Sequence, residues 1–565
     1  MAQPTEPFVH TARNRALWGE RVLLSVWTWF AITAACAGIW AFDHRFEVTP
    51  DGLRYLDLAS AALKDGPGGL ISDIWCPAYP GFLAVWLWVL RPRPAMEAPV
   101  VHFAGWLLFC GAAAAFALFL GAWIKLDVWK REKRGVSPAV ESFFCYCAFV
   151  WIFKMPEFST TFPDTMLSAC LFLAAWCCVK AAEGASNGFY VLLGLTLAAG
   201  YYIKPTGFVV ALILLAILLA WPPAQASRRK VVLAVLVFCA VSLPLVIAIS
   251  KKAGDVTTSE DGKLVYLWEV NGFYKELGWT GQQSAEHGMP LHPPRIAFTR
   301  PLVLEFASPV GGTYPLFDDP AYWFAGVRIR FNLRQQVAAF VNNLRRSHAG
   351  LDYGLLWVGV ITLGILRGRR LIELLPVPVR WIVVWPLCTC AMFLTVHLEH
   401  RYMAPFVALM AAGVYSWLAS AVGEAANGVL LTLSIAMIFS IASVTDDSVS
   451  RIIEQRVMHY RSEDQEIADS LSLLGLKAGD SIATVGSSFD AYWARIGKLR
   501  IVAQALDKNE FWNTDEGRMD ELMAHLRSLG IKAVVARAGG EESRPGWRDL
   551  PPPSEGEIFR AFLLH

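Results

Sequence analysis

Long apolar segments recur along most of this 565-residue chain, and they constrain its fold more than any other feature. A helix needs about 20 mostly apolar residues to cross the roughly 30 Å hydrocarbon core of a bilayer. About eleven segments approach that length, at 22–42, 100–123, 138–154, 163–181, 187–203, 206–222, 231–250, 350–367, 380–397, 402–420 and 426–444. We therefore expect a mostly α-helical, polytopic membrane protein with about eleven transmembrane helices.

The composition also indicates a membrane protein. Charged residues make up 17% of the chain and hydrophobic residues 55%, whereas soluble domains carry about 25% charged residues. The formal net charge of +2 gives no support to a nucleic-acid partner, so the lipid bilayer is the partner that composition predicts. Most of the 11 cysteines lie in apolar runs and no CxxC spacing occurs, so we expect no zinc site and no disulfide framework.

Basic residues predict the orientation of the spans, because Lys and Arg gather in the short cytoplasmic loops of membrane proteins. The basic segments 13–21, 125–134, 227–230 and 367–370 all fall on one side if the N-terminus is cytoplasmic. The N-terminal segment lacks a small-residue cleavage site, so we expect a cytoplasmic tail that enters the first span. The C-terminus would then lie outside the cytoplasm.

Three regions do not have the character of spans. Residues 43–99 are expected to form a first outer loop with two surface helices, since the apolar segment 79–90 is too short to cross a bilayer. Residues 251–349 form a long polar outer loop, and both loops belong to a transmembrane domain of residues 1–444. Residues 445–565 are expected to form a soluble α/β domain outside the cytoplasm.

The soluble domain is predicted from its pattern of short strands and helices. Apolar, β-branched runs predict strands at 481–486, 500–506, 532–538 and 557–565, with helices near 487–497 and 519–530. Its sequence leaves its role open between binding an acceptor and covering a site in the membrane domain.

Asp51 and Arg54 stand near the start of the first surface helix, three residues apart. In one interpretation Asp51 caps the helix 52–64 and Arg54 is a solvated neighbour. In the other, the carboxylate is a general base and the guanidinium binds a lipid-borne phosphate. The two interpretations are compatible.

Asp164 and Lys204 mark two further span ends on the same predicted face. Asp164 begins a span, where it is either a first-turn acid or a group that polarises a hydroxyl. Lys204 lies in a Lys-Pro-Thr-Gly break between two apolar runs. A lysine at membrane depth is costly unless it is paired, so Lys204 either binds a phosphate or extends to the interface.

Two later segments add polar candidates. Residues 397–401 read HLEHR and place His400 and Arg401 at the outer end of a span. This spacing is not the HExxH of zinc enzymes, so an ionic cluster is favoured over a metal site, with a divalent cation as a minor alternative. In the long loop, Asp318 and Trp323 form the acid and aromatic mixture that binds sugars, or else anchor the loop at the interface.

Five short motifs, in order along residues 20–420, resemble the GT-C superfamily of membrane glycosyltransferases. They are DxxRY at 51–55, PxYP at 77–80, an acid before a span in "FPDT" at 162–165, KPxG at 204–207 and RYxxP at 401–405. The resemblance is greatest to the bacterial enzymes related to the lipid A aminoarabinose transferase and to protein O-mannosyltransferases.

The resemblance implies a function and roles for particular residues. It implies transfer of a sugar from a polyprenyl-phosphate donor to a hydroxyl of a glycan, lipid or protein, with inversion, at the outer face of the bacterial inner membrane. Asp51 would be the general base, and Asp164 would lie beside the acceptor. Arg54, Lys204 and Arg401 would bind the donor phosphate. Weaker candidates for acceptor or sugar contacts are Tyr55, Tyr79, His400, Asp318 and Trp323.

Two other classes of membrane protein stay open at this level. A polysaccharide polymerase or ligase also uses a large outer loop, but it would not need the Asp51 and Arg54 pair. A transporter of lipid-linked glycans should show similar halves and broken helices at the membrane midplane, which this sequence does not. No glycine-rich nucleotide motif occurs, so a nucleotide-sugar donor is disfavoured.

Overall fold

The computed structural model describes residues 26–126, 135–154, 162–184, 186–222, 227–272, 295–306, 328–346, 353–367, 380–457, 461–486, 488, 490–539, 544–551 and 558–564. The chain folds into two compact units, and each is built from three segments. The first comprises residues 1–44, 105–245 and 336–452, and the second comprises residues 45–104, 246–335 and 453–565.

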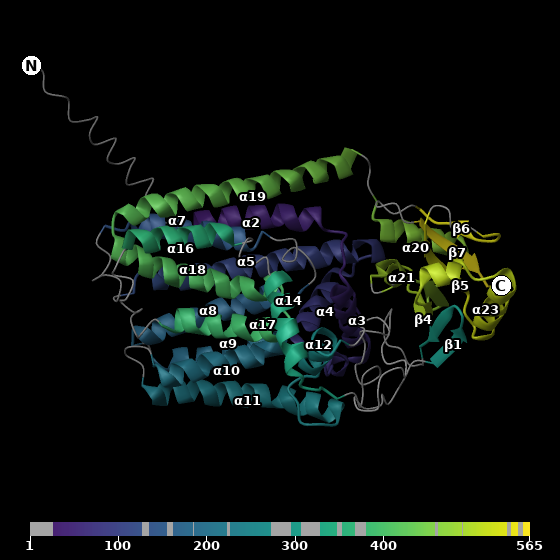
Figure 1. Cartoon of the computed structure of the whole chain (residues 1–565), viewed down its shortest axis with the longest axis horizontal. Helices are drawn as coiled ribbons and strands as arrows, with labels where there is room; N and C mark the ends of the chain where they lie inside the picture. The colour runs from purple at the N-terminus through teal and green to yellow at the C-terminus, as the bar shows by residue number, and fades with distance from the viewer. Residues whose placement is uncertain are drawn as a thin grey trace, which may run out of the picture. The chain divides into compact units, whose positions relative to one another are not determined.

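The first unit is a bundle of helices that run side by side (Figure 1). Its helices are α2 (Val26–Asp43), α7 (Pro138–Ile152), α8 (Asp164–Ala182), α9 (Asn187–Ile203), α10 (Thr206–Ala220), α16 (Gly354–Arg367), α17 (Trp381–Val396) and α18 (His400–Val422). Parts of α5 (Glu97–Trp123), α11 (Arg228–Ala253), α14 (Leu333–Arg346) and α19 (Ala425–Val457) also belong to it. Short connections make α9 an antiparallel neighbour of both α8 and α10, and they make α17 and α18 antiparallel neighbours of each other.

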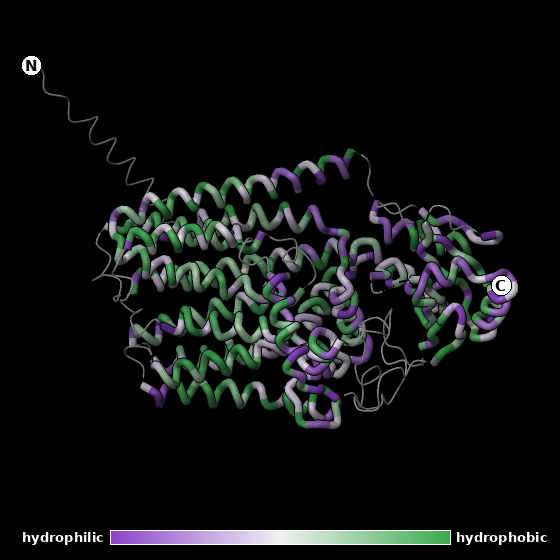
Figure 2. The backbone as a smooth tube through the Cα atoms, in the orientation of Figure 1, coloured by the Kyte–Doolittle hydropathy of each residue, from purple (hydrophilic) through white to green (hydrophobic). Residues whose placement is uncertain are grey.

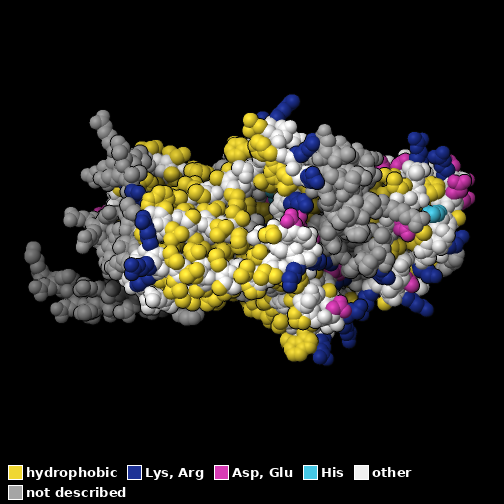
Figure 3. All heavy atoms as spheres, turned by 90° about the horizontal axis from the view of Figure 1, so that it is seen from below, with side chains coloured by type: hydrophobic (Ala, Val, Ile, Leu, Met, Phe, Trp, Pro, Cys, Tyr) yellow, Lys and Arg dark blue, Asp and Glu magenta, His cyan; other side chains and the backbone are white. Residues whose placement is uncertain are grey.

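Each of the eleven predicted spans corresponds to one of these helices, which confirms the mostly helical membrane architecture. Within the described ranges, five helices are long and apolar enough to cross a membrane: Pro94–Trp123, Asp164–Ala182, Arg228–Ala253, His400–Val422 and Ala425–Val457. Shorter apolar helices accompany them. In Figure 2 the tubes of the bundle are hydrophobic along most of their length. Figure 3 shows apolar side chains over the exposed face of the bundle, with basic side chains at its end.

Close backbone approaches and a few polar contacts fix the bundle. A Cβ on Gly194 of α9 would lie 2.6 Å from the carbonyl oxygen of Ala234 in α11, so only glycine allows this approach. Trp123 of α5 donates through Nε1 to Oγ of Ser416 in α18 at 3.0 Å, and that hydroxyl donates to Glu141 of α7. Small residues and buried hydrogen bonds are the usual means by which membrane helices associate.

The second unit joins the first loop, the long loop and the C-terminal region. Its helices include α3 (Pro50–Asp65), α4 (Ala78–Leu90), α12 (Asp261–Glu269), α20 (Glu463–Leu473), α21 (Tyr492–Ile496), α22 (Lys508–Trp512) and α23 (Glu516–Ser528). The helices α3 and α4 are the two that we predicted within the first loop. Their position at the membrane surface stays a prediction.

A seven-stranded sheet in the order β1-β2-β4-β3-β5-β7-β6 organises this unit. Its strands are β1 (Arg295–Thr299), β2 (Leu302–Glu305), β3 (Ser481–Val485), β4 (Arg500–Ala505), β5 (Ala533–Ala538), β6 (Arg548–Asp549) and β7 (Ile558–Leu563). The central β4-β3-β5 strands are parallel and the outer pairs are antiparallel. The four strands predicted in the C-terminal region are therefore present.

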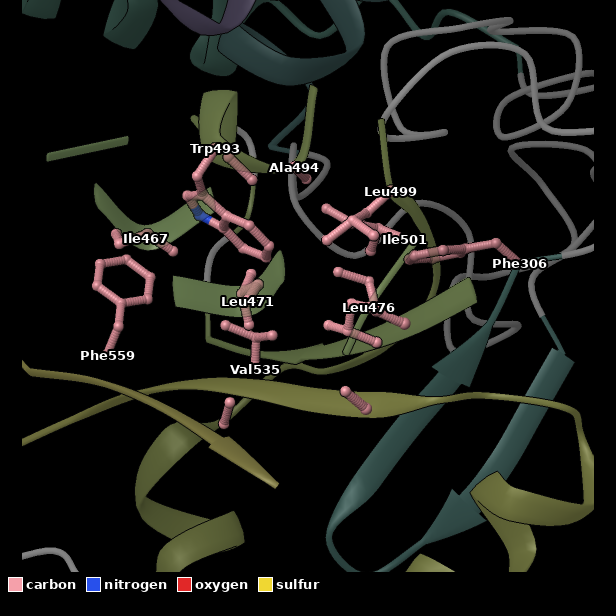
Figure 4. Close-up of a cluster of buried hydrophobic side chains, with 14 of the residues drawn as sticks. Phe306, Ile467, Leu471, Leu476, Trp493, Ala494, Leu499, Ile501, Val535 and Phe559 are labelled. Atoms are coloured by element: carbon pink, nitrogen blue, oxygen red, sulfur yellow. The ribbon is translucent and has the colours of Figure 1, made fainter. Parts of the chain in front are cut away.

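The core of the sheet draws on three distant parts of the chain. One face carries Ile467, Trp493 and Phe559 (Figure 4), and Ile74 and Leu264 from the two loops extend the same buried cluster. The strands β1 and β2 also come from the long loop, and β2 pairs with β4 through Val303 and Ala505. No strands were predicted for residues 295–305, because each run is short and needs the edge of another sheet to complete its hydrogen bonds.

Candidate functional site

The helix α3 of the second unit carries Asp51, Arg54 and Tyr55. Its N-cap is Thr49, whose Oγ1 accepts from the backbone N–H of Gly52 at 3.1 Å. The prediction that Asp51 caps the helix was therefore wrong. Pro50 occupies the first turn, where its missing N–H costs nothing, and this shifts the cap to the residue before it. Asp51 lies in that first turn, next to the positive end of the helix dipole.

Arg54 and Tyr55 are buried on α3. The ring of Tyr55 packs edge-on against Tyr79 of α4 and against Trp75, with ring centroids 4.9 Å apart in both cases. Tyr79 is itself buried. These aromatic contacts join the DxxRY and PxYP motifs and fix the face of α3 on which Arg54 lies.

In the first unit, Asp164 and Lys204 form a buried ion pair. Lys204 Nζ donates to Asp164 Oδ1 at 2.6 Å, and the two side chains are 12% and 4% exposed. Asp164 is the first residue of α8, and Lys204 follows the last residue of α9. Two residues 40 positions apart in sequence therefore meet because α8 and α9 form a helical hairpin.

The Lys-Pro-Thr-Gly break is observed where it was predicted. Lys204 has an extended backbone, and α10 begins at Thr206 after Pro205. A Cβ on Gly207 would overlap the carbonyl oxygen of Gly200, so the missing side chain allows α10 to start against the end of α9. This tight turn holds the Lys204 side chain at the helix end.

Arg401 adds a second cation beside Asp164. It is buried at the start of α18, where its Nε lies 3.8 Å from Asp164 Oδ2 and bonds to Glu399 Oε2. His397 Nε2 lies 2.9 Å from Glu399 Oε1. Burial alone would raise the pKa of Glu399, but the hydrogen bond from His397 and the positive charges of Arg401, His397 and Lys204 lower it to about 2. Glu399 is therefore ionised throughout the physiological pH range.

Two aromatic rings complete this ionic cluster. Lys204 Nζ lies 3.8 Å from the centroid of the Tyr402 ring, and the Arg401 guanidinium carbon lies 3.6 Å from that of Phe162. Such contacts stabilise cations that have lost part of their hydration. We name Asp164, Lys204, Glu399, Arg401 and Tyr402 the helix-end cluster.

The structure thus brings together three of the predicted site residues, namely Asp164, Lys204 and Arg401. His400 lies next to them in sequence, and its ring packs against Tyr353 at a centroid distance of 6.2 Å. Asp318 and Trp323 lie outside the described residues. Tyr402 and Phe162 were not predicted as partners of the cations, although they stand within the RYxxP and FPDT motifs.

The helix-end cluster has the chemistry of an anion site that already contains its own counter-charges. Asp164 and Glu399 balance Lys204 and Arg401, so a ligand phosphate would exchange for a carboxylate instead of filling an unpaired site. Among the described residues, no group of three or more His, Cys, Asp or Glu side chains is arranged to hold a metal ion.

The fold and this site define a multi-pass membrane protein with a charged cluster at the ends of apolar helices. Residues 126–248, which include Asp164 and Lys204, match the family model described as dolichyl-phosphate-mannose-protein mannosyltransferase. The whole chain is similar to the crystal structure of ArnT from Cupriavidus metallidurans in the apo state, with 12% identity, a TM-score of 0.50, and coverage of 94% of this chain and 97% of that one.

A second crystal structure of ArnT, bound to undecaprenyl phosphate, aligns with 13% identity and a TM-score of 0.40, covering 95% of this chain and 98% of that one. Comparison with curated protein sequences gives no significant match. The family match over residues 126–248 and the shared fold support the resemblance to the GT-C superfamily of membrane glycosyltransferases that the motifs predicted.

Proposed function

We propose that this protein transfers a sugar from a polyprenyl-phosphate donor to an acceptor hydroxyl at the outer face of the bacterial inner membrane. The matched family model is described as a dolichyl-phosphate-mannose-protein mannosyltransferase. Its donor, mannose linked to dolichyl phosphate, is a polyprenyl-phosphate sugar. The observation that carries the proposal is the helix-end cluster, where Lys204 and Arg401 both lie within 4 Å of Asp164.

Lys204 and Arg401 are the groups that would stabilise the phosphate as it leaves the sugar. When the bond between the sugar and the phosphate breaks, negative charge grows on the phosphate, and cations held in a poorly hydrated site stabilise that charge. Lys204 offers a point charge and Arg401 a planar fork that matches phosphate oxygens. As the phosphate takes over these contacts, Asp164 is released to hydrogen-bond the acceptor.

Asp51 is the proposed general base, and Arg54 the further phosphate ligand, on the ground of the DxxRY motif. The carboxylate takes the proton of the acceptor hydroxyl, whose oxygen forms a bond to the anomeric carbon. The bond from that carbon to the phosphate oxygen breaks on the opposite side, so the configuration inverts and polyprenyl phosphate leaves.

Sugar transfer from synthetic polyprenyl-phosphate donors tests this proposal. The Asp51→Asn variant should lose about 10²- to 10⁴-fold in turnover, while Asp65→Asn, an exposed acid at the end of the same helix, should keep full turnover. Full activity in Asp51→Asn would show that another group is the base. Release of polyprenyl phosphate should accompany each transfer, and its absence would favour a transporter of lipid-linked glycans.

A further inference from the structure

The helix α14 (Leu333–Arg346) buries Asn343 and exposes a set of large apolar side chains. Its exposed apolar side chains are Leu333, Val337, Phe340 and Leu344, with exposed fractions of 67%, 52%, 39% and 55%. These positions are spaced by four, three and four residues, so they form one stripe along the helix. A helix of a soluble protein would bury such a stripe instead of exposing it.

The polar face of α14 is buried against the end of α17. Asn343 Nδ2 donates to the carbonyl oxygens of Leu394 at 3.2 Å and Val396 at 2.9 Å, and Gln336 donates to that of Thr395. The last carbonyls of a helix have no partner within the helix. Two amide side chains of α14 therefore cap an apolar bundle helix, which places α14 at the level where that helix ends.

This attachment also explains why the apolar stripe cannot turn inward. Ala339 and Asn343 are buried on the docked face, and at 3.6 residues per turn the stripe lies roughly a quarter turn away from them. The stripe consequently faces outward from the bundle, beside the span end that leads into Glu399 and Arg401.

The charge of α14 favours one kind of partner. Its sequence contains three arginines and no acid, and Arg334 and Arg345 are exposed. Apolar residues on one side and arginines on another characterise helices that lie in the interface of a bilayer, where the cations meet anionic headgroups. A protein partner would have no such reason to be positioned at the end of a span.

We infer that α14 is an interfacial helix, with Leu333, Val337, Phe340 and Leu344 inserted among lipid acyl chains and Arg334 and Arg345 bound to anionic headgroups. The bilayer surface then holds α14 in place, and its amide caps hold the end of α17. The inference rests on burial and hydrogen bonds, and it stands whether or not the protein transfers a sugar.

Fluorescence quenching in the full-length protein tests this position. A genetically encoded fluorescent amino acid replaces Phe340 in one variant and Asn342 in a second, and both are reconstituted in nanodiscs of phosphatidylcholine and phosphatidylglycerol. Asn342 is exposed and lies roughly half a turn from Phe340, so it is the matched control. Lipids with a nitroxide close to the headgroup report contact with the bilayer, and iodide reports contact with water.

The label at position 340 should be quenched several-fold more by the lipid nitroxide than the label at 342, and iodide should give the opposite order. Equal quenching of both labels by iodide would show that the stripe lies in water. Protection of position 340 from both quenchers would show that protein covers it. Either result overturns the inference, and a label at Leu344 repeats the test if the first variant fails to fold.

Discussion

Lys204 and Lys180 make ion pairs of similar length in very different surroundings. Lys204 lies 2.6 Å from Asp164, with side chains 12% and 4% exposed, whereas Lys180 lies 2.7 Å from Glu183, with side chains 30% and 34% exposed. Lys204→Met removes the nearer of the two cations beside the buried Asp164 carboxylate and leaves Arg401 at 3.8 Å, so it should cost up to about 3–5 kcal/mol of stability. Lys180→Met should cost about 0–1 kcal/mol. Unfolding of the two variants in nanodiscs measures the difference.

A double variant separates stability from activity in this pair. Lys204→Met with Asp164→Asn removes both charges, so it should recover part of the stability that Lys204→Met loses. If Lys204 binds the donor phosphate, sugar transfer should stay defective in the double variant. Transfer that returns together with stability would show that Lys204 acts only through the fold.

In the second unit, the environment of Asp464 favours the neutral form of its carboxyl group. Burial raises its pKa to about 7, although its carboxylate accepts from the backbone N–H of Trp493 at 2.9 Å. Because the folded pKa lies above the unfolded one, the stability that this group contributes is complete below about pH 4 and is lost as the pH rises to about 7. Asp464→Asn keeps an acceptor for Trp493 without this dependence.

The Asp464→Asn variant should therefore unfold at a higher temperature than the wild type at pH 8, and at a similar temperature at pH 4. Thermal unfolding at the two pH values measures this, with Asp469→Asn, an exposed acid of the same helix, as the control. A wild type and variant that respond equally to pH would contradict the assignment.

At the scale of residues, the sequence predicted the members of the helix-end cluster better than their partners. Asp164, Lys204 and Arg401 stand out because an ionisable residue at membrane depth is costly unless it is paired. Tyr402 and Phe162 could not be assigned, since an aromatic ring near a span end is equally typical of an interfacial anchor. Thr49 was missed as the cap because the choice between adjacent polar residues depends on local backbone angles.

At the scale of elements, Arg495 connects three segments of the second unit. From α21 it donates to Asp57 of α3 at 2.5 Å, to Ser60 of α3 at 2.7 Å and to Glu97 of α5 at 2.8 Å. Its side chain is 12% exposed. Arg495 therefore links the C-terminal region to α3, the helix that carries Asp51 and Arg54.

Arg495→Gln leaves two carboxylates without their shared cation, so the second unit should lose about 3–5 kcal/mol. The backbone amides of α3 should exchange hydrogen faster, and Arg495→Lys should restore little, because an ammonium cannot make the same set of bonds. Hydrogen exchange followed by mass spectrometry measures this. Arg518→Gln, which removes an exposed pair with Asp515, should leave α3 unchanged, and equal exchange in both variants would exclude the anchoring role of Arg495.

Two strands that the sequence did not predict are completed by a distant partner. Residues 295–305 form two strands because β2 pairs with the edge of β4. By contrast, the long apolar helices were predicted to within a few residues, because helix hydrogen bonds are local and the bilayer sets the length. The helix α19 extends to Val457 although its apolar run ends near 444, because Thr445 and Arg451 of this extension bond to Trp40 and Asp43 of α2.

At the scale of the whole molecule, the alternating directions of the bundle helices place the basic loops at one end of the bundle and the helix-end cluster at the other end. The basic residues Lys125, Arg228 and Arg380 stand where α5 ends and where α11 and α17 begin, whereas Asp164 and Arg401 stand where α8 and α18 begin. Because α17 and α18 run antiparallel through a short connection, Arg380 and Arg401 belong to opposite ends of the bundle. If the basic ends are cytoplasmic, the cluster faces the outer side.

Reporter fusions test this orientation directly. We expect green fluorescent protein to fluoresce when fused after residue 134 or 227, and alkaline phosphatase to be active after residue 254 or at the C-terminus, residue 565. The last pair of helices decides the result for the C-terminus, because the turn between α18 and α19 has no Lys or Arg to direct it, only Gly423 and Glu424. Fluorescence at the C-terminus with active phosphatase after residue 254 would contradict this orientation and the sheet itself, because β2 of the long loop pairs with β4 of the C-terminal region and paired strands lie on one side of the membrane.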